Sequence, residues 1–229
     1  MSFSAHQVVD RVGALRSQIN SIAGGRLVKI VAVTKTFPAE AMSAAYVAEC
    51  DAVGENYAQE LINKVSLVSP AELLPVHFIG HVQLNKVKRL MAVVDVWQTI
   101  DRPLLIETLA TATDKGGIQG ISRRSEVFIQ VNATSETQKS GCALNEVEGL
   151  VALAARRGLS VVGLMTIGPS SGDAAETRRA FRSVAKLQNE LGLAECSMGM
   201  SGDFQIAIEE GSTMVRIGSR LFGERPRSG

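Results

Sequence analysis

Residues 28–35 decide the fold prediction, and they read Val28-Lys29-Ile30-Val31-Ala32-Val33-Thr34-Lys35. The run is apolar over most of its length and predicts a buried β-strand that ends at Lys35. Burial disfavours the ammonium form of lysine, and a neutral amine can attack a carbonyl carbon to form a Schiff base. The alternative is a lysine whose aliphatic stem packs on the protein while its charged head reaches water.

Seven further strand candidates follow, and segments of helical character separate them. The eight predicted strands are residues 28–34, 51–53, 75–80, 94–100, 126–132, 159–165, 195–198 and 213–217. Short apolar strands without strict alternation are typical of a parallel sheet that is buried on both faces. Eight strand–helix units in order predict an α/β fold, a single (β/α)8 TIM barrel over residues 1–229. An open doubly wound sheet is the alternative, but no Gly-x-Gly-x-x-Gly motif follows the first strand.

An extra helix is predicted before the first strand. Apolar residues recur at helical spacing from Val8 to Ile22. Ser4 is a candidate N-cap, and Gly24-Gly25 is expected to end the helix. Residues 114–125 are rich in glycine and polar side chains and are expected to form a surface loop.

Composition argues against several functional classes. The formal net charge of +1 and the low aromatic content give no basis for nucleic-acid binding. The basic residues near positions 86–89 and 123–124 are expected on solvated surfaces. No stretch approaches the roughly 20 apolar residues of a membrane span, and charged residues interrupt the N-terminal segment where a signal peptide would be apolar. Three cysteines without a Cys-x-x-Cys pair favour a reducing, cytoplasmic setting with neither a zinc site nor a disulfide framework.

Polar residues follow the predicted strands at the end where functional side chains of a (β/α)8 barrel gather. Gly218-Ser219, after the eighth strand, precede a helical start, and exposed N–H groups there suit a phosphate. Ser201-Gly202 offer a second turn with a hydroxyl donor; the alternative is that both glycines only permit tight turns. An amine at Lys35 facing a phosphate cradle suits a phosphorylated aldehyde such as pyridoxal 5'-phosphate. Arg216 would then face the pyridine nitrogen, unless it pairs with a barrel carboxylate.

Several short motifs occur in a fixed order along the chain. They are Ala32-Val33-Thr34-Lys35-Thr36, Gly54-Glu55-Asn56-Tyr57, His77-Phe78-Ile79-Gly80 with Gln83-x-Asn85-Lys86, Lys139-Ser140-Gly141, Gly163-Leu164-Met165, Met198-Gly199-Met200-Ser201 and Ser212-Thr213-Met214-Val215-Arg216-Ile217-Gly218. Their combination resembles the YggS/PROSC family of pyridoxal phosphate homeostasis proteins, whose barrel is similar to the N-terminal domain of alanine racemase. The resemblance runs from the first helix to Gly223.

The resemblance implies a set of cofactor-binding residues. They are Lys35, Asn56, His77, Met165, Ser201, Arg216, Gly218 and Ser219. Lys35 matches the lysine that holds pyridoxal 5'-phosphate covalently as a Schiff base, and Arg216 matches the arginine near the pyridine nitrogen. Ser201, Gly218 and Ser219 match phosphate-binding positions, whereas Asn56 and Met165 match positions close to the ring.

His77 matches a histidine at the end of the third strand; a core histidine with satisfied hydrogen bonds is the alternative. The sequence departs from some relatives at His81 and at Gly202-Asp203, and neither departure removes an expected cofactor contact.

Two functions remain open from the sequence. Racemisation needs an acid/base group on each face of the substrate carbon, and in racemases of this fold a tyrosine from a second domain supplies one of them. Here the tyrosines are Tyr46 and Tyr57, neither is expected opposite Lys35, and the chain ends at Gly229 directly after the eighth unit. The resemblance therefore favours a non-catalytic, cytoplasmic carrier, expected as a monomer, that buffers pyridoxal 5'-phosphate or delivers it to apo-enzymes. A pyridoxal-phosphate-dependent amino-acid racemase is the alternative.

Overall fold

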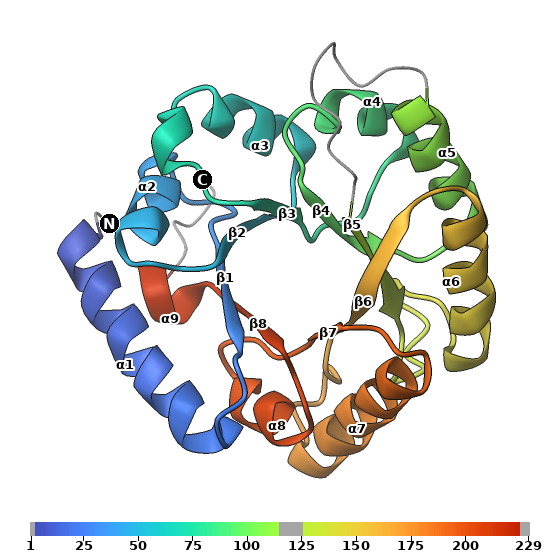
Figure 1. Cartoon of the computed structure of the whole chain (residues 1–229). Coiled ribbons are helices and arrows are strands. Elements are labelled where there is room, and N and C mark those ends of the chain that lie inside the picture. Colours follow the sequence, from blue (N-terminus) through green and yellow to red (C-terminus); the bar gives the residue numbers. More distant parts are fainter. Residues whose placement is uncertain (1–2, 115–125, 225–229) are drawn as a thin grey trace.

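Eight parallel strands close into one barrel in the order of the chain, as Figure 1 shows. The computed structural model describes residues 3–114 and 126–224. The strands are β1 (Lys29–Val33), β2 (Ala52–Glu55), β3 (Val76–Phe78), β4 (Val96–Ile100), β5 (Glu126–Val131), β6 (Ser160–Thr166), β7 (Glu195–Ser197) and β8 (Met214–Ile217). The predicted (β/α)8 barrel is therefore confirmed. The predicted loop after Asp114 and the basic pair at 123–124 lie outside the described residues.

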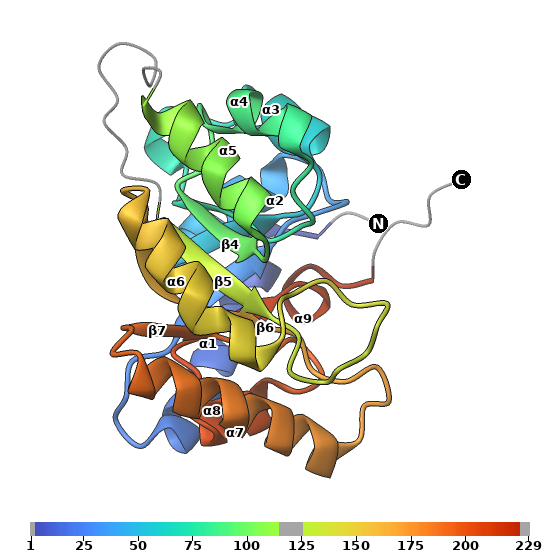
Figure 2. The same ribbon diagram turned by 90° about the vertical axis from the view of Figure 1, so that its right-hand side faces the viewer.

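Helices surround the barrel on its outside, as the two views in Figures 1 and 2 show. They are α1 (Ala5–Ala23), α2 (Glu40–Val47), α3 (Ala58–Val65), α4 (Val87–Leu90), α5 (Pro103–Asp114), α6 (Val147–Arg156), α7 (Ala174–Glu190), α8 (Phe204–Glu209) and α9 (Ser219–Phe222), with 3-10 turns η1 (Pro70–Glu72), η2 (Leu84–Lys86) and η3 (Leu144–Glu146). Between β3 and β4, the helical structure is limited to η2 and the single turn α4, and residues 91–93 form a turn. Within the described ranges, no helix has the length and apolar character that crossing a bilayer requires.

The extra N-terminal helix α1 begins and ends where the sequence predicts. Ser4 Oγ accepts from the backbone N–H of Gln7, and Gln7 Oε1 accepts from the N–H of Ser4, both at 3.2 Å, which forms a capping box. Gly24 ends the helix in the left-handed conformation at φ 59°. The buried face of α1 consists of Val8, Val12, Leu15, Ile19 and Ala23. It packs beside α2, α8 and α9, so α1 joins the first and last units of the barrel.

An aromatic cluster joins three distant segments of the chain near one end of α1. Phe37, in the turn after β1, lies with its ring centroid 6.1 Å from that of Phe3 and 5.2 Å from that of Phe222. The centroids of Phe3 and Phe222 are 5.3 Å apart. Arg11 Nη1 also donates to the carbonyl of Leu221 at 2.7 Å. The start of the chain therefore holds the turn after β1 against α9.

The barrel interior contains an apolar cluster that is separate from the larger core between strands and helices. Its buried members are Val31, Ala52, Val96, Phe128, Met165 and Met214. They come from six different strands, so this cluster fills the barrel rather than leaving a pore.

Replacing Phe222 by alanine should lower the free energy of unfolding by about 3 kcal/mol, because the ring is buried against two aromatic partners. Urea denaturation of the two proteins measures the difference. Leu27→Ala is the matched control, since Leu27 is 93% exposed and its loss should change the midpoint little. Equal effects of both substitutions would contradict the stabilising role of the aromatic cluster.

Candidate functional site

Lys35 lies just beyond the C-terminal end of β1 and is half-buried. β1 pairs with β2 on one side, where Val33 lies opposite Gly54, and with β8 on the other, where Ala32 lies opposite Ile217. Since all three strands are parallel, the residues that follow them meet at one edge of the barrel. The structure therefore brings Lys35 to the edge that it shares with Asn56 and Gly218.

Glycine is favoured at position 218 because space at this edge is short. A Cβ atom placed on it would lie 3.3 Å from the carbonyl oxygen of Val33, tighter than ordinary van der Waals contact. Its φ of −117° is available to other residues, so close approach to β1, rather than an unusual turn, favours glycine. Ser219 follows as an exposed residue at the start of α9, and Ser201 lies partly exposed after β7. Phosphate binding by these three residues stays a prediction.

A buried charged cluster that the sequence analysis did not select lies behind Lys35. Lys64 Nζ donates at 2.7 Å to both Glu55 Oε1 and the carbonyl of Thr34, and at 2.5 Å to Glu60 Oε1. Glu55 Oε1 also accepts from Thr34 Oγ1 at 2.7 Å, and Glu60 Oε1 accepts from the N–H of Thr36 at 2.5 Å. Burial raises the pKa of Glu55, and the charge of Lys64 opposes that rise. The sequence signal was the i,i+4 spacing of Glu60 and Lys64; their burial was not visible in it.

The backbone at Thr36 has an unusual conformation for its residue type. Its φ is 66°, in the left-handed region that β-branched residues rarely adopt. Such a conformation costs about 1 to 3 kcal/mol and persists only where the surroundings hold it. The hydrogen bond to Glu60 supplies one such restraint directly next to Lys35.

Asn56 lines a cavity and carries a side-chain oxygen that can accept a hydrogen bond. The cavity has a volume of about 280 Å³ and is lined by Asn56, Ile79, Gly80, His81, Thr99, Gln130, Val131, Asn132, Lys139, Ser140 and Ile167. Among the described residues, Oδ1 of Asn56 is buried without a hydrogen-bond partner. Gly80 packs so closely on the backbone of Asn56 that a Cβ atom there would clash. Asn56 is therefore fixed in place and can accept a hydrogen bond from a ligand.

A chain of buried polar groups crosses the barrel interior. Gln98 Nε2 donates to His77 Nδ1 at 2.6 Å, and Ser197 Oγ donates to Gln98 Oε1 at 2.7 Å. Arg216 Nη1 donates to the hydroxyl and the carbonyl of Ser197, both at 2.8 Å, and Nη2 donates to the carbonyl of Thr166 at 2.7 Å. The guanidinium of Arg216 is thus oriented by β6 and β7.

The two ionisable side chains at the ends of this hydrogen-bonded network, His77 and Arg216, have different charges at neutral pH. Burial lowers the pKa of His77 to about 3, with a smaller contribution from Lys29, so its imidazole is neutral. The hydrogen bond to Gln98 fits the interpretation of His77 as a core histidine. Burial lowers the pKa of Arg216 to about 10, so its guanidinium stays protonated. Met165, from the same set of predicted residues, belongs to the apolar cluster of the barrel interior.

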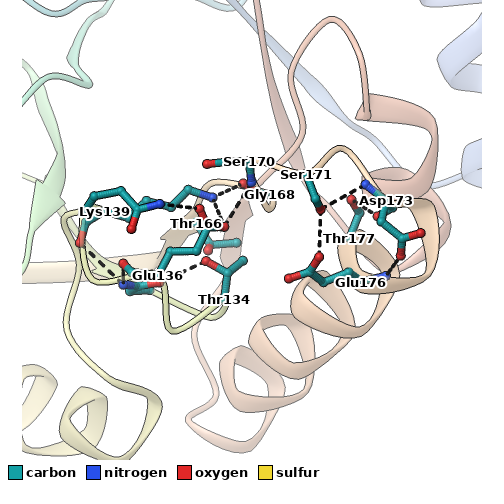
Figure 3. Close-up of polar contacts among 12 residues, drawn as sticks. Thr134, Glu136, Lys139, Thr166, Gly168, Ser170, Ser171, Asp173, Glu176 and Thr177 are labelled. Atoms are coloured by element: carbon teal, nitrogen blue, oxygen red, sulfur yellow. Dashed lines mark hydrogen bonds and ion pairs between the residues drawn. The ribbon is translucent and has the colours of Figure 1, made fainter.

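An ion pair within the loop after β5 is joined by hydrogen bonds to the loop after β6, which Figure 3 shows. Lys139 Nζ donates to Glu136 Oε1 at 2.7 Å and to the carbonyl of Gly168 at 2.6 Å. Glu136 Oε1 also accepts from the N–H of Ser170 at 3.0 Å. Hydrogen bonds from Lys139 and Ser170 lower the pKa of Glu136 to about 2, so the carboxylate stays charged at neutral pH. These contacts hold Lys139, which the sequence analysis did not select as a site residue, at the cavity wall.

All three cysteines of the chain are free thiols in buried positions. Burial raises the pKa of each thiol to about 12 for Cys50, Cys142 and Cys196. At neutral pH they are therefore protonated and weakly nucleophilic.

Comparison with known proteins is consistent with this geometry. A family model described as "Alanine racemase, N-terminal domain" matches residues 11–226. The pyridoxal phosphate homeostasis protein of Bos taurus is 39% identical over 216 residues, which cover 87% of this chain and 78% of that protein. The chain belongs to the family of pyridoxal phosphate homeostasis proteins. The homeostasis protein of Aquifex aeolicus is 36% identical over 209 residues, covering 88% of this chain and 89% of that protein.

Solved structures of family members and of racemases share the barrel. PipY of Synechococcus elongatus, solved with PLP bound, has a TM-score of 0.82 at 29% identity, covering 94% of this chain and 100% of that one. Alanine racemase of Clostridium difficile has a TM-score of 0.73 at 14% identity, covering 96% of this chain and 58% of that one. The racemase likeness concerns the fold alone, and it confirms the predicted similarity to the alanine racemase N-terminal barrel.

With His77→Asn, the free energy of unfolding should decrease less at acid pH than it does in the wild type. The folded protein resists protonating His77 until about pH 3, whereas the unfolded chain takes up that proton near pH 6.5. Stability from this group is therefore complete above pH 6.5 and is lost as the pH falls toward 3. Asparagine retains an acceptor for Gln98 but cannot be protonated in this range. The free energy of unfolding of the variant should therefore fall less than that of the wild type between pH 6.5 and pH 3.

Urea denaturation at several pH values measures this difference. His6→Asn is the matched control, because the His6 side chain is 87% exposed and its removal should leave the acid profile nearly unchanged. A His77→Asn profile that matches the wild type would contradict the assignment of a buried neutral histidine.

Proposed function

We propose that this protein binds pyridoxal 5'-phosphate covalently on Lys35 and buffers it or delivers it to apo-enzymes in the cytoplasm. The observation that carries the proposal is the position of Lys35, half-buried at the edge of a barrel whose family includes a PLP-bound member. When bound, the cofactor supplies an aldehyde, which forms a Schiff base with a primary amine. We expect the carrier to act as a monomer.

The residues at this edge fit such a cofactor. Asn56 presents a buried acceptor without a partner among the described residues, and a bound polar group would satisfy it. Gly218 keeps the edge between β8 and β1 clear of a side chain, and Ser201 and Ser219 offer hydroxyl donors for the phosphate.

Arg216 favours holding a cofactor over using it for carbanion chemistry. Its guanidinium is buried, protonated and fixed by Ser197 and Thr166. We propose that it faces the pyridine nitrogen, where a neighbouring positive charge disfavours protonation. An unprotonated pyridine ring withdraws electrons less strongly, so the chain's own residues would hold the cofactor in a less reactive state.

Amino-acid racemisation is the second candidate, because the family model carries the name of alanine racemase. A racemase needs an acid/base on the side opposite the lysine. Both tyrosines of the chain are open to solvent: Tyr46 on α2 is 44% exposed, and Tyr57 at the start of α3 is 54% exposed. Neither is held in a buried contact as a catalytic base would be, which supports the carrier proposal.

Purified protein mixed with pyridoxal 5'-phosphate should turn yellow, and borohydride should fix the label on one lysine. Peptide mapping by mass spectrometry should place that label on Lys35. Lys35→Ala should abolish the borohydride-stable label, whereas Lys186→Ala, at a residue whose side chain is 75% exposed on α7, should retain it. A protein that stays colourless with added cofactor would refute the proposal.

Delivery makes a separate prediction. The loaded protein should restore the activity of an apo-enzyme faster than an equal amount of free cofactor does. The reason is that the carrier transfers the cofactor directly to the enzyme instead of releasing it into bulk solution. The measurement is the recovery rate of a pyridoxal-phosphate-dependent enzyme stripped of its cofactor. Equal recovery rates would count against delivery, and steady conversion of L- to D-alanine by the pure protein would favour the racemase instead.

A further inference from the structure

The turn that carries Lys35 is held from behind by three charged residues of β2 and α3. We call Glu55, Glu60 and Lys64 the charged clamp. Its contacts reach both neighbours of Lys35. Lys64 Nζ and Glu55 Oε1 bind the carbonyl and the hydroxyl of Thr34, each at 2.7 Å, and Glu60 Oε1 binds the N–H of Thr36 at 2.5 Å.

The clamp is unusually buried for charged residues. The side chain of Glu55 has no exposed surface, that of Lys64 is 7% exposed and that of Glu60 is 25% exposed. Taking such charges out of water is costly, and well-packed apolar side chains often stabilise a fold as well or better. A contribution to stability alone is therefore a weak explanation for the clamp.

The direction of the contacts supplies a stronger explanation. Lys64 binds Thr34 directly after β1, Glu55 at the end of β2 and Glu60 on its own helix. Thr36 holds a left-handed backbone at φ 66°, which places a sharp change of direction immediately after Lys35. Without the acceptor on Glu60, the N–H of Thr36 loses its partner in the clamp and the turn loses a restraint.

We propose that Glu55, Glu60 and Lys64 are positioning residues that fix the Lys35 turn and so aim its amine at an incoming aldehyde. This inference rests on the proposed function, because it assigns the clamp a role in attaching the cofactor. The clamp acts through the backbone on both sides of Lys35 and does not itself touch the reacting atoms.

Two substitutions at Glu60 separate positioning from general stability. Glu60→Ala removes the acceptor for Thr36 N–H, whereas Glu60→Gln keeps an oxygen at the same place without the charge. In the cofactor-free protein, hydrogen exchange at the Thr36 amide should be about tenfold faster in Glu60→Ala and close to wild type in Glu60→Gln. This readout needs no cofactor.

The second readout is the rate at which Lys35 forms its borohydride-stable label with pyridoxal 5'-phosphate. Glu60→Ala should slow labelling on the order of tenfold, because a displaced nucleophile reacts less often in the correct geometry. Glu60→Gln should restore most of the rate. Glu190→Ala is the matched control: it removes the exposed i,i+4 pair with Lys186 on α7, and it should change neither readout.

The possible results are distinguishable. Faster exchange with unchanged labelling in Glu60→Ala would overturn the positioning role, and unchanged exchange would overturn the clamp itself. Failure of Glu60→Gln to restore labelling while it restores exchange would also overturn the positioning role. A wild-type protein that forms no label would refute the proposed function, and the positioning role with it, whereas the exchange data would still report whether the clamp holds the turn.

Discussion

The pairing of β1 with β8 is the constraint on which the arrangement of the site depends. Four residues of β1 are in register with four of β8, from Lys29 opposite Met214 to Ala32 opposite Ile217. This closure brings the first strand next to the last one, so that Lys35 and Gly218 share an edge although most of the chain separates them. The helix α1 and the aromatic cluster around Phe37 reinforce the same junction from outside.

Within the barrel, an apolar cluster and a polar chain have distinct roles. The apolar cluster that includes Met165 fills the interior. The polar network from His77 to Arg216 gives each of its buried side chains a hydrogen-bond partner. Burial lowers the pKa of His77 to about 3, which leaves its imidazole neutral, whereas the pKa of Arg216, lowered by burial to about 10, still leaves its guanidinium protonated at neutral pH. Arg216 thus presents a buried positive charge that Ser197 and Thr166 hold in place.

Features that depend on local sequence could be predicted, and features that depend on long-range contacts could not. The cap at Ser4, the stop at Gly24 and most strands follow from neighbouring residue types. The position of Lys35 at the barrel edge follows from counting strand–helix units. The burial of Lys64 was not predictable, because lysine is rarely buried and its partners Thr34 and Glu55 lie outside its own helix, just after β1 and at the end of β2. His77 had two interpretations from the sequence, because its hydrogen-bond partner Gln98 comes from another strand.

The burial of the three cysteines has a consequence for chemical selectivity. Aldehydes add to thiolates as well as to amines, and a thiolate near the site would compete for a carbonyl compound. With each thiol pKa raised to about 12, Cys50, Cys142 and Cys196 are almost entirely protonated at neutral pH and shielded from solvent. A reactive aldehyde that reaches this fold is therefore offered nitrogen rather than sulfur.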